Sequence, residues 1–182
     1  MRLRGCLGGL TCLPADGRLG AMIELFWYPG TCARVPFIAL EEIGAAYETR
    51  LVRLLDRDER AAYERDVNPK SRVPALRIDG RLITENPAIQ TYLARRYPGA
   101  RLLPEDPDEA LDALVLMSWF AAGIHPVITR TRFPMFVCDR AESHDDIRRR
   151  GREALAASFA ILEARLSDRP WLFGDRWSIV DG

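Results

Sequence analysis

Cys32 is the residue best placed for nucleophilic chemistry. It follows a short apolar run and a Pro-Gly turn, and it precedes a segment with helical spacing. At a helix start, free backbone N–H groups and the positive end of the helix dipole favour an anion. A thiol there is expected to have a lowered pKa, so it either attacks as a nucleophile or stabilises a neighbouring thiolate. The alternative is a small buried cysteine that only packs.

A second segment of interest is RVPAL at residues 72–76. Pro74 lacks a backbone donor, which suits the first position of a strand. If the Val73–Pro74 peptide bond is cis, Val73 turns its N–H and C=O outward, where they can pair with a peptide. Trans is the commoner isomer, so the sequence leaves this open.

A third segment is TENP at residues 84–87. The free N–H groups of a helix N-terminus can hold a carboxylate, and Glu85 just before them can bind an ammonium group. The two together suit the charged ends of an amino acid. The alternative is that Asn86 caps the helix and Glu85 is solvated.

These segments must be positioned by the elements around them. Residues 22–27 predict a strand, residues 35–43 a helix ended by Gly44, residues 50–55 a second strand, and residues 56–67 are compatible with a helix. Asp79-Gly80 between two apolar runs predicts a hairpin of residues 74–78 and 81–84. A helix follows, with Asn86 as N-cap and Pro87 at its first position. This order predicts a four-stranded mixed sheet, the thioredoxin arrangement, over residues 22–99.

The rest of the chain predicts helices. Residues 100–107 carry two prolines and are interpreted as a linker, and residues 108–182 contain no convincing strand. Helices are expected over residues 110–124 and 147–166, the second opened by a capping box of Ser143 and Asp146. The fold class is therefore α/β plus all-α, a thioredoxin-like domain followed by a helical one. A capping signature at residues 178–181 stands next to the last residue, so we expect the helical domain to be incomplete.

Composition excludes several classes of function. The 26 basic and 26 acidic residues cancel, which disfavours a nucleic-acid partner. The four cysteines form no CxxC pair and there are two histidines, so we expect no metal site, no disulfide framework and a cytoplasmic location. No stretch approaches the roughly 18 apolar residues of a membrane span, so no membrane partner is expected. Residues 1–21 are interpreted as a disordered tail or a mis-assigned start.

Several spaced motifs occur in one consistent order. They are YPGTC at residues 28–32, NPKSRVPAL at 68–76, LITENPAI at 82–89, WLFGD at 171–175 and SIVD at 178–181. Together they resemble the glutathione S-transferases, especially the bacterial beta class, over residues 22–182. The resemblance implies a homodimer that binds glutathione as co-substrate and adds it to a small electrophile.

The resemblance also implies residue roles. Cys32 falls on the cysteine that contacts the glutathione sulfur, and Val73 would pair with the cysteinyl backbone beside a cis Pro74. Glu85 and Asn86 would hold the γ-glutamyl end. His125, near the end of the first long helix of the second domain, would line the cleft.

Several positions depart from the family pattern, among them Ala33 and Arg72. Ala33 replaces a serine that often follows the cysteine, so no serine hydroxyl can activate the thiol from there. Arg72 stands where glutamine is common, so one binding contact to glutathione is expected to differ.

The sequence is compatible with three functions. The first is a glutathione transferase. The second is a thiol–disulfide reductase or dehalogenase in which Cys32 forms a mixed disulfide with glutathione. The third is a non-catalytic, ligand-binding member of the family.

Overall fold

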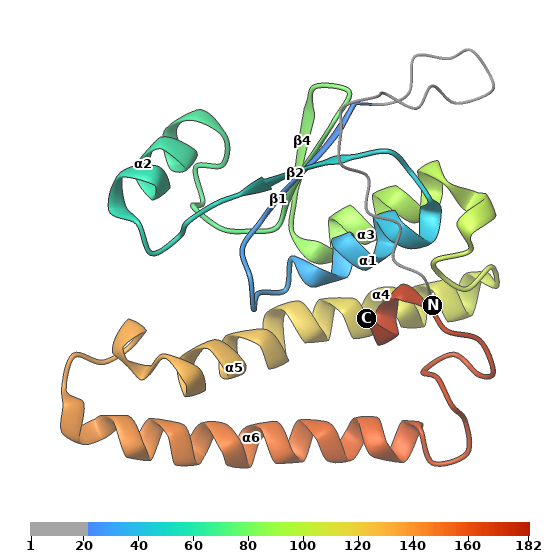
Figure 1. Ribbon diagram of the computed structural model, residues 1–182. Helices are drawn as coiled ribbons and strands as arrows, with labels where there is room; N and C mark the ends of the chain where they lie inside the picture. Colours follow the sequence, from blue (N-terminus) through green and yellow to red (C-terminus); the bar gives the residue numbers. More distant parts are fainter. Residues whose placement is uncertain (1–21) are drawn as a thin grey trace, which may run out of the picture.

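The computed structural model of the protein describes residues 22–182, and the expectation for residues 1–21 lies outside them. Its first half is a four-stranded sheet with three helices, and its second half is helical (Figure 1). The strands are β1 Ile23–Trp27, β2 Glu48–Leu51, β3 Ala75–Ile78 and β4 Arg81–Thr84. The main helices are α1 Arg34–Ile43, α2 Arg57–Asp66, α3 Asn86–Arg96, α4 Pro107–Trp119, α5 His125–Arg132 and α6 His144–Arg165.

The sheet has the order β2-β1-β3-β4. β1 runs parallel to β2 and antiparallel to β3, and β3 forms a hairpin with β4. The turn of this hairpin places both Asp79 and Gly80 at positive φ, 50° and 80°, the geometry that suits a two-residue hairpin link. The predicted thioredoxin-like mixed sheet is confirmed.

The second strand was placed wrongly from the sequence. It was expected over residues 50–55, but β2 ends at Leu51 and the chain turns soon afterwards. All four residues of β2 are exposed at the edge of the sheet, so no buried face imposes an alternating pattern on them.

Alternation along the inner strands separates two faces of the sheet. Ile23 and Leu25 of β1 are almost fully buried in a core with residues of α1 and α3, which lie along one face (Figure 1). On the other face, Tyr63 of α2 packs its ring against Phe26 at a centroid distance of 5.7 Å.

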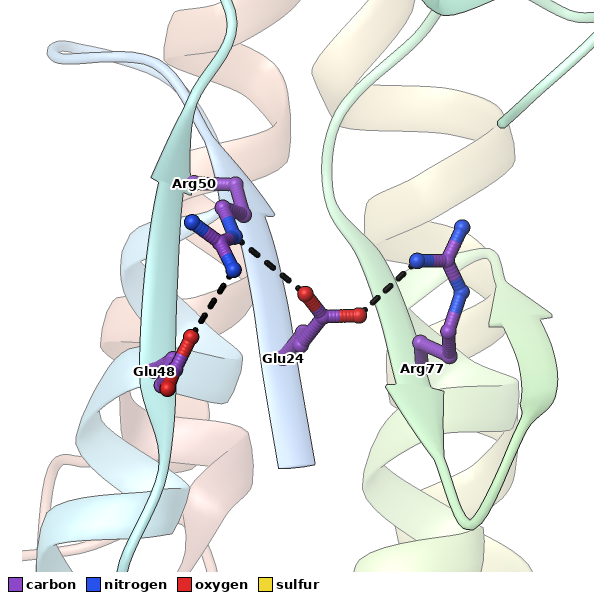
Figure 2. Close-up of polar contacts among 4 residues, drawn as sticks. All are labelled: Glu24, Glu48, Arg50 and Arg77. Carbon is purple, nitrogen blue, oxygen red and sulfur yellow. Dashed lines mark hydrogen bonds and ion pairs between the residues drawn. The ribbon is translucent and has the colours of Figure 1, made fainter. Parts of the chain in front are cut away.

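Beside this apolar cluster, charged side chains lie on the same face (Figure 2). Glu24 of β1 accepts a hydrogen bond from Arg77 Nη1 of β3 at 2.8 Å and one from Arg50 Nε of β2 at 3.2 Å. Arg50 also bonds Glu48 at 2.9 Å, and Arg77 lies over the Phe26 ring. Ion pairs thus link three neighbouring strands on this face.

The first helix of the second half is longer than predicted. It was expected to end at Ile124, but helical structure continues through a π-helical turn, Phe120–Ile124, into α5. In the π turn His125 N–H bonds to the carbonyl of Phe120, five residues back. Pro126 has no N–H to donate, and the wider turn lets the chain pass this residue without ending the helix.

Two further expectations for this half are wrong. Ser143 makes no side-chain cap at the start of α6, because residues 141–143 already form a 3₁₀ turn there. The second was that no stretch approaches the apolar length of a membrane span. Pro107–Arg132 is long and apolar enough, by length and composition, to cross a membrane. In this fold its Ala113, Leu116 and Met117 pack into the core of the helical half.

The predicted capping box at residues 178–181 is present. Asp181 accepts from the Ser178 N–H at 2.9 Å and from the Leu172 N–H at 2.9 Å. A 3₁₀ turn, Ile179–Asp181, follows. Ile179 is 1% exposed in the core beside the sheet, whereas Val180 belongs to the core of the helical half. This segment therefore joins the two cores.

Candidate active site around Cys32

Cys32 lies in the loop between β1 and α1, two residues before α1 begins. Gly30 makes the turn at φ 70°, a conformation that favours glycine, and Thr31 Oγ1 donates to the carbonyl of Tyr28 at 2.6 Å. The Cys32 thiol is half-buried and donates to the backbone carbonyl of Val73, with sulfur and oxygen 3.8 Å apart. The first two candidate segments therefore meet.

Burial raises the pKa of the Cys32 thiol above its ordinary value of 9.0, and the negative charge of Glu85 raises it further. A backbone hydrogen bond, the Asn86 side chain and the charge of Arg72 lower it by less. The expectation of a lowered pKa is therefore wrong for this geometry, because desolvation outweighs the field at the helix start. Cys32 is a neutral thiol at pH 7 that can donate a hydrogen bond.

Two side chains fix the backbone at Arg72 by hydrogen bonds. Its carbonyl accepts hydrogen bonds from Tyr63 Oη at 3.0 Å and from Asn68 Nδ2 at 2.7 Å, and Asn68 is 1% exposed. The Val73–Pro74 peptide bond, whose isomer the sequence left open, is cis. The Arg72 side chain is exposed, and no carboxylate within residues 22–182 pairs with its guanidinium.

Asn86 plays a different part from the one expected. The N-cap of α3 is Glu85, at φ 70°, and neither side chain caps the helix. Instead Asn86 Nδ2 donates to the carbonyl of Cys32 at 2.9 Å. Asn86 Oδ1 is buried and has no partner within the described part of the chain. The third candidate segment is thus tied directly to the first.

His125 begins α5 and lies seven residues before the end of that helix, not near the end as expected. Its ring is half-buried. Burial lowers the pKa of His125 below its ordinary 6.5, and the positive charge of Arg72 lowers it further. Arg72 therefore lies close enough to act on a residue of the helical half.

The structure brings five of the residues proposed from the sequence together, namely Cys32, Arg72, Val73, Glu85 and Asn86, and His125 is related to them only through the charge of Arg72. Hydrogen bonds join Cys32 to Val73 and Asn86, and the charges of Arg72 and Glu85 act on the thiol. No cluster of side chains able to hold a metal occurs within residues 22–182.

Sequence reasoning missed Lys70, whose ammonium group bonds Thr84 and Glu85. The one available signal was that Lys70 is the only lysine in the chain.

Family models match both halves of the chain. One, described as glutathione S-transferase, N-terminal domain, matches residues 25–101, and another, glutathione S-transferase, C-terminal domain, matches residues 145–182.

Two relatives are similar over most of their length. Glutathione S-transferase GstA of Escherichia coli O157:H7 is 31% identical over 87% of this chain and 77% of that protein. Maleylacetoacetate isomerase of Pseudomonas aeruginosa is 30% identical over 85% and 74%.

Two solved structures are also similar. A glutathione transferase homologue from Sulfitobacter, with bound glutathione, has a TM-score of 0.76 at 28% identity, covering 87% of this chain and 77% of that one. A beta-class glutathione S-transferase of Sphingomonas chungbukensis has a TM-score of 0.72 at 30% identity, covering 86% and 76%.

Proposed function

The chain belongs to the glutathione S-transferase family, and from this premise we propose that it is a glutathione transferase. It binds glutathione and adds the glutathione thiolate to a small electrophile. Thiol addition needs the ionised sulfur, so the site must lower the pKa of the bound glutathione thiol.

The protonation state of Cys32 decides between two mechanisms, conjugation and thiol exchange. Burial keeps this thiol neutral, so its single S–H can turn from the Val73 carbonyl to the glutathione sulfur and stabilise the thiolate there. A mixed disulfide would need Cys32 itself as the attacking thiolate, and its raised pKa disfavours that step. We therefore favour conjugation over thiol exchange.

The other residues would hold the tripeptide. The backbone of Val73, beside the cis proline, pairs with the cysteinyl unit, and Glu85 accepts the ammonium group of the glutamyl end. The buried Asn86 Oδ1 lacks a donor within residues 22–182, so it can accept an N–H of the ligand. Arg72, whose charge acts on both Cys32 and His125, would lie beside the bound ligand.

A second candidate is a glutathione-dependent isomerase. Maleylacetoacetate isomerase is one of the similar proteins, and Arg72 favours such a reaction. Its exposed guanidinium acts on the Cys32 thiol and has no carboxylate partner within residues 22–182, so it can attract an acidic substrate. Reversible addition of the thiolate to a carbon–carbon double bond would allow rotation and return glutathione unchanged.

We further propose a cytoplasmic homodimer, supported by the family membership. Light scattering on the purified chain tests the dimer, and a monomer at micromolar concentration would contradict it.

Variants of Cys32 test the mechanism. After calorimetric titration with glutathione, the protein is assayed with an aryl halide, an unsaturated dicarboxylate and a glutathione mixed disulfide. Cys32→Ala removes the donor, and we expect it to slow conjugation by about tenfold or more, as the loss of one hydrogen bond to a charged group does. Cys32→Ser keeps a donor and should retain most of the activity.

The same variants separate the alternatives. If Cys32 formed a mixed disulfide, Ser and Ala would both abolish disulfide reduction while conjugation stayed unaffected. Failure of the wild-type protein to bind glutathione would point to the non-catalytic alternative. Cys138→Ala serves as a control for the loss of a free thiol elsewhere.

A further inference from the structure

Lys70 connects two segments of the candidate site. It lies in the loop between α2 and β3, and its Nζ donates to Thr84 Oγ1 at 2.7 Å and to Glu85 Oε1 at 2.5 Å. Thr84 is the last residue of β4, and Glu85 occupies the N-cap position of α3. Of the 26 basic residues in the sequence, this is the only lysine.

Both ends of the contact are held in place. At one end, the buried Asn68 accepts the Lys70 backbone N–H at 3.1 Å and donates to the carbonyl of Arg72. At the other end, Glu85 has φ 70°, a conformation that residues with a Cβ rarely adopt; such strained residues cluster at active sites and ligand clamps.

One of the two oxygens of the Glu85 carboxylate is free to bind a ligand. Lys70 takes Oε1, and Oε2 has no hydrogen-bond partner within residues 22–182. A carboxylate whose orientation is already fixed binds a second cation without losing further side-chain freedom.

We propose that Lys70 is a positioning residue, which fixes Glu85 so that its free oxygen accepts the ammonium group at the glutamyl end of the ligand. The inference rests on the proposed function, because it takes glutathione as the ligand. Repulsion between the two ammonium groups is limited, because the Lys70 and Glu85 side chains are 48% and 64% exposed and water screens their charges. Lys70 also offsets the negative charge of Glu85, which opposes a thiolate at Cys32.

The test compares glutathione with its deamino analogue, in which hydrogen replaces the glutamyl ammonium group. Calorimetry gives the dissociation constant of each for wild type, Lys70→Gln and Lys70→Arg. We expect Lys70→Gln to weaken glutathione binding about three- to fivefold, the effect of an exposed ion pair, and to leave the analogue unchanged. Lys70→Arg can still bridge to Glu85 and should restore binding.

Arg60→Gln is the matched control. Arg60 donates to Ser71 Oγ of the same loop at 2.9 Å, so this variant removes an equal charge without touching Glu85. It should bind both ligands as wild type does.

Amine labelling tests the pair without any ligand. After digestion, mass spectrometry separates acylated Lys70 from the acylated N-terminal amine. Removing its carboxylate partner with Glu85→Gln should make Lys70 react several times faster, because Nζ then loses the ion pair that shields it from the reagent.

Three results would overturn the inference. They are equal weakening of both ligands by Lys70→Gln, tighter or unchanged glutathione binding in that variant, and unchanged labelling in Glu85→Gln. A wild-type protein that binds no glutathione would instead refute the proposed function, and this inference with it, before any variant is compared.

Discussion

Three residues from both halves of the chain set the electrostatics of the site. Burial favours the uncharged forms of Cys32 and His125, by raising the pKa of the first and lowering that of the second. The charge of the Arg72 guanidinium acts on both of them. A neutral donor, a neutral imidazole and one cation form a site suited to an anionic sulfur.

The proximity of Arg72 to His125 can be tested by titration. Removing the charge with Arg72→Gln should raise the pKa of His125 but leave it below 6.5, because burial is the larger cause. Since its folded pKa is lowered, neutral His125 contributes stability above pH 6.5 that is lost as the pH falls through the folded pKa. NMR of the His125 ring measures its pKa in both proteins, and urea denaturation above and below pH 6.5 measures the stability. An unchanged His125 would mean that the two halves are arranged differently.

At the scale of elements, polar and steric contacts hold adjacent strands and helices in register. The Glu24 carboxylate bridges β2 and β3 from β1 (Figure 2). Its side chain is 15% exposed, so its charge is partly desolvated and depends on its arginine partners.

Glu24→Gln should lower stability at pH 7 by about 1 kcal/mol, the upper range for a partly exposed pair. Burial alone would raise the pKa of Glu24, but hydrogen bonds and charges from Arg77 and Arg50 bring it below 4.5. The stabilisation is therefore present above pH 4.5 and lost as the pH falls through the folded pKa. Urea denaturation at pH 7 and pH 3 should show the two proteins converging in acid. Glu48→Gln, at a 67% exposed side chain, is the control.

Helices α5 and α6 approach each other closely at Gly151. A Cβ there would lie 1.9 Å from Thr131 Oγ1 and 2.9 Å from Thr131 Cβ. Gly→Ala in a helix ordinarily stabilises by about 1 kcal/mol, but overpacking costs about 1–3 kcal/mol. We expect Gly151→Ala to lower the melting temperature, and adding Thr131→Ala to recover part of the loss. A higher melting temperature in the single variant would contradict this packing.

On the scale of the whole molecule, the segment at residues 178–182 joins the two halves. Ile179 N–H donates to the carbonyl of Leu102 at 2.8 Å, and its side chain fills the core beside the sheet. Val180 next to it enters the helical core. Two adjacent residues thus couple the packing of both halves.

Truncating that contact should destabilise both halves together. Ile179→Ala is expected to cost about 2–4 kcal/mol, as for other fully buried aliphatic residues. Tryptophan fluorescence and circular dichroism should report one shifted urea transition. Ile161→Ala, at a 60% exposed site, should change stability by less than about 0.5 kcal/mol. Separate transitions for the two probes in the Ile179 variant would show that the halves unfold independently.

Local patterns predicted much of the fold. The hairpin around Asp79-Gly80, the ends of α1 and the capping box at Ser178 follow from residues close together in the chain, and all three are present. The bounds of β2 and the length of the helix after Pro107 were predicted wrongly, because no local sequence pattern marks them. An exposed edge strand has no buried face to mark it, and the π turn before Pro126 depends on how the surrounding helix continues.

In the candidate site, too, some features follow from the local sequence and others only from the tertiary structure. The sequence by itself determined which segments carry the chemistry, because strand ends, helix starts and turn residues are encoded locally. Only the tertiary structure decided that Cys32 is a neutral donor and that Lys70 reaches Glu85. Desolvation and charge pairing depend on residues 15 to 54 positions apart, and no local pattern specifies those contacts.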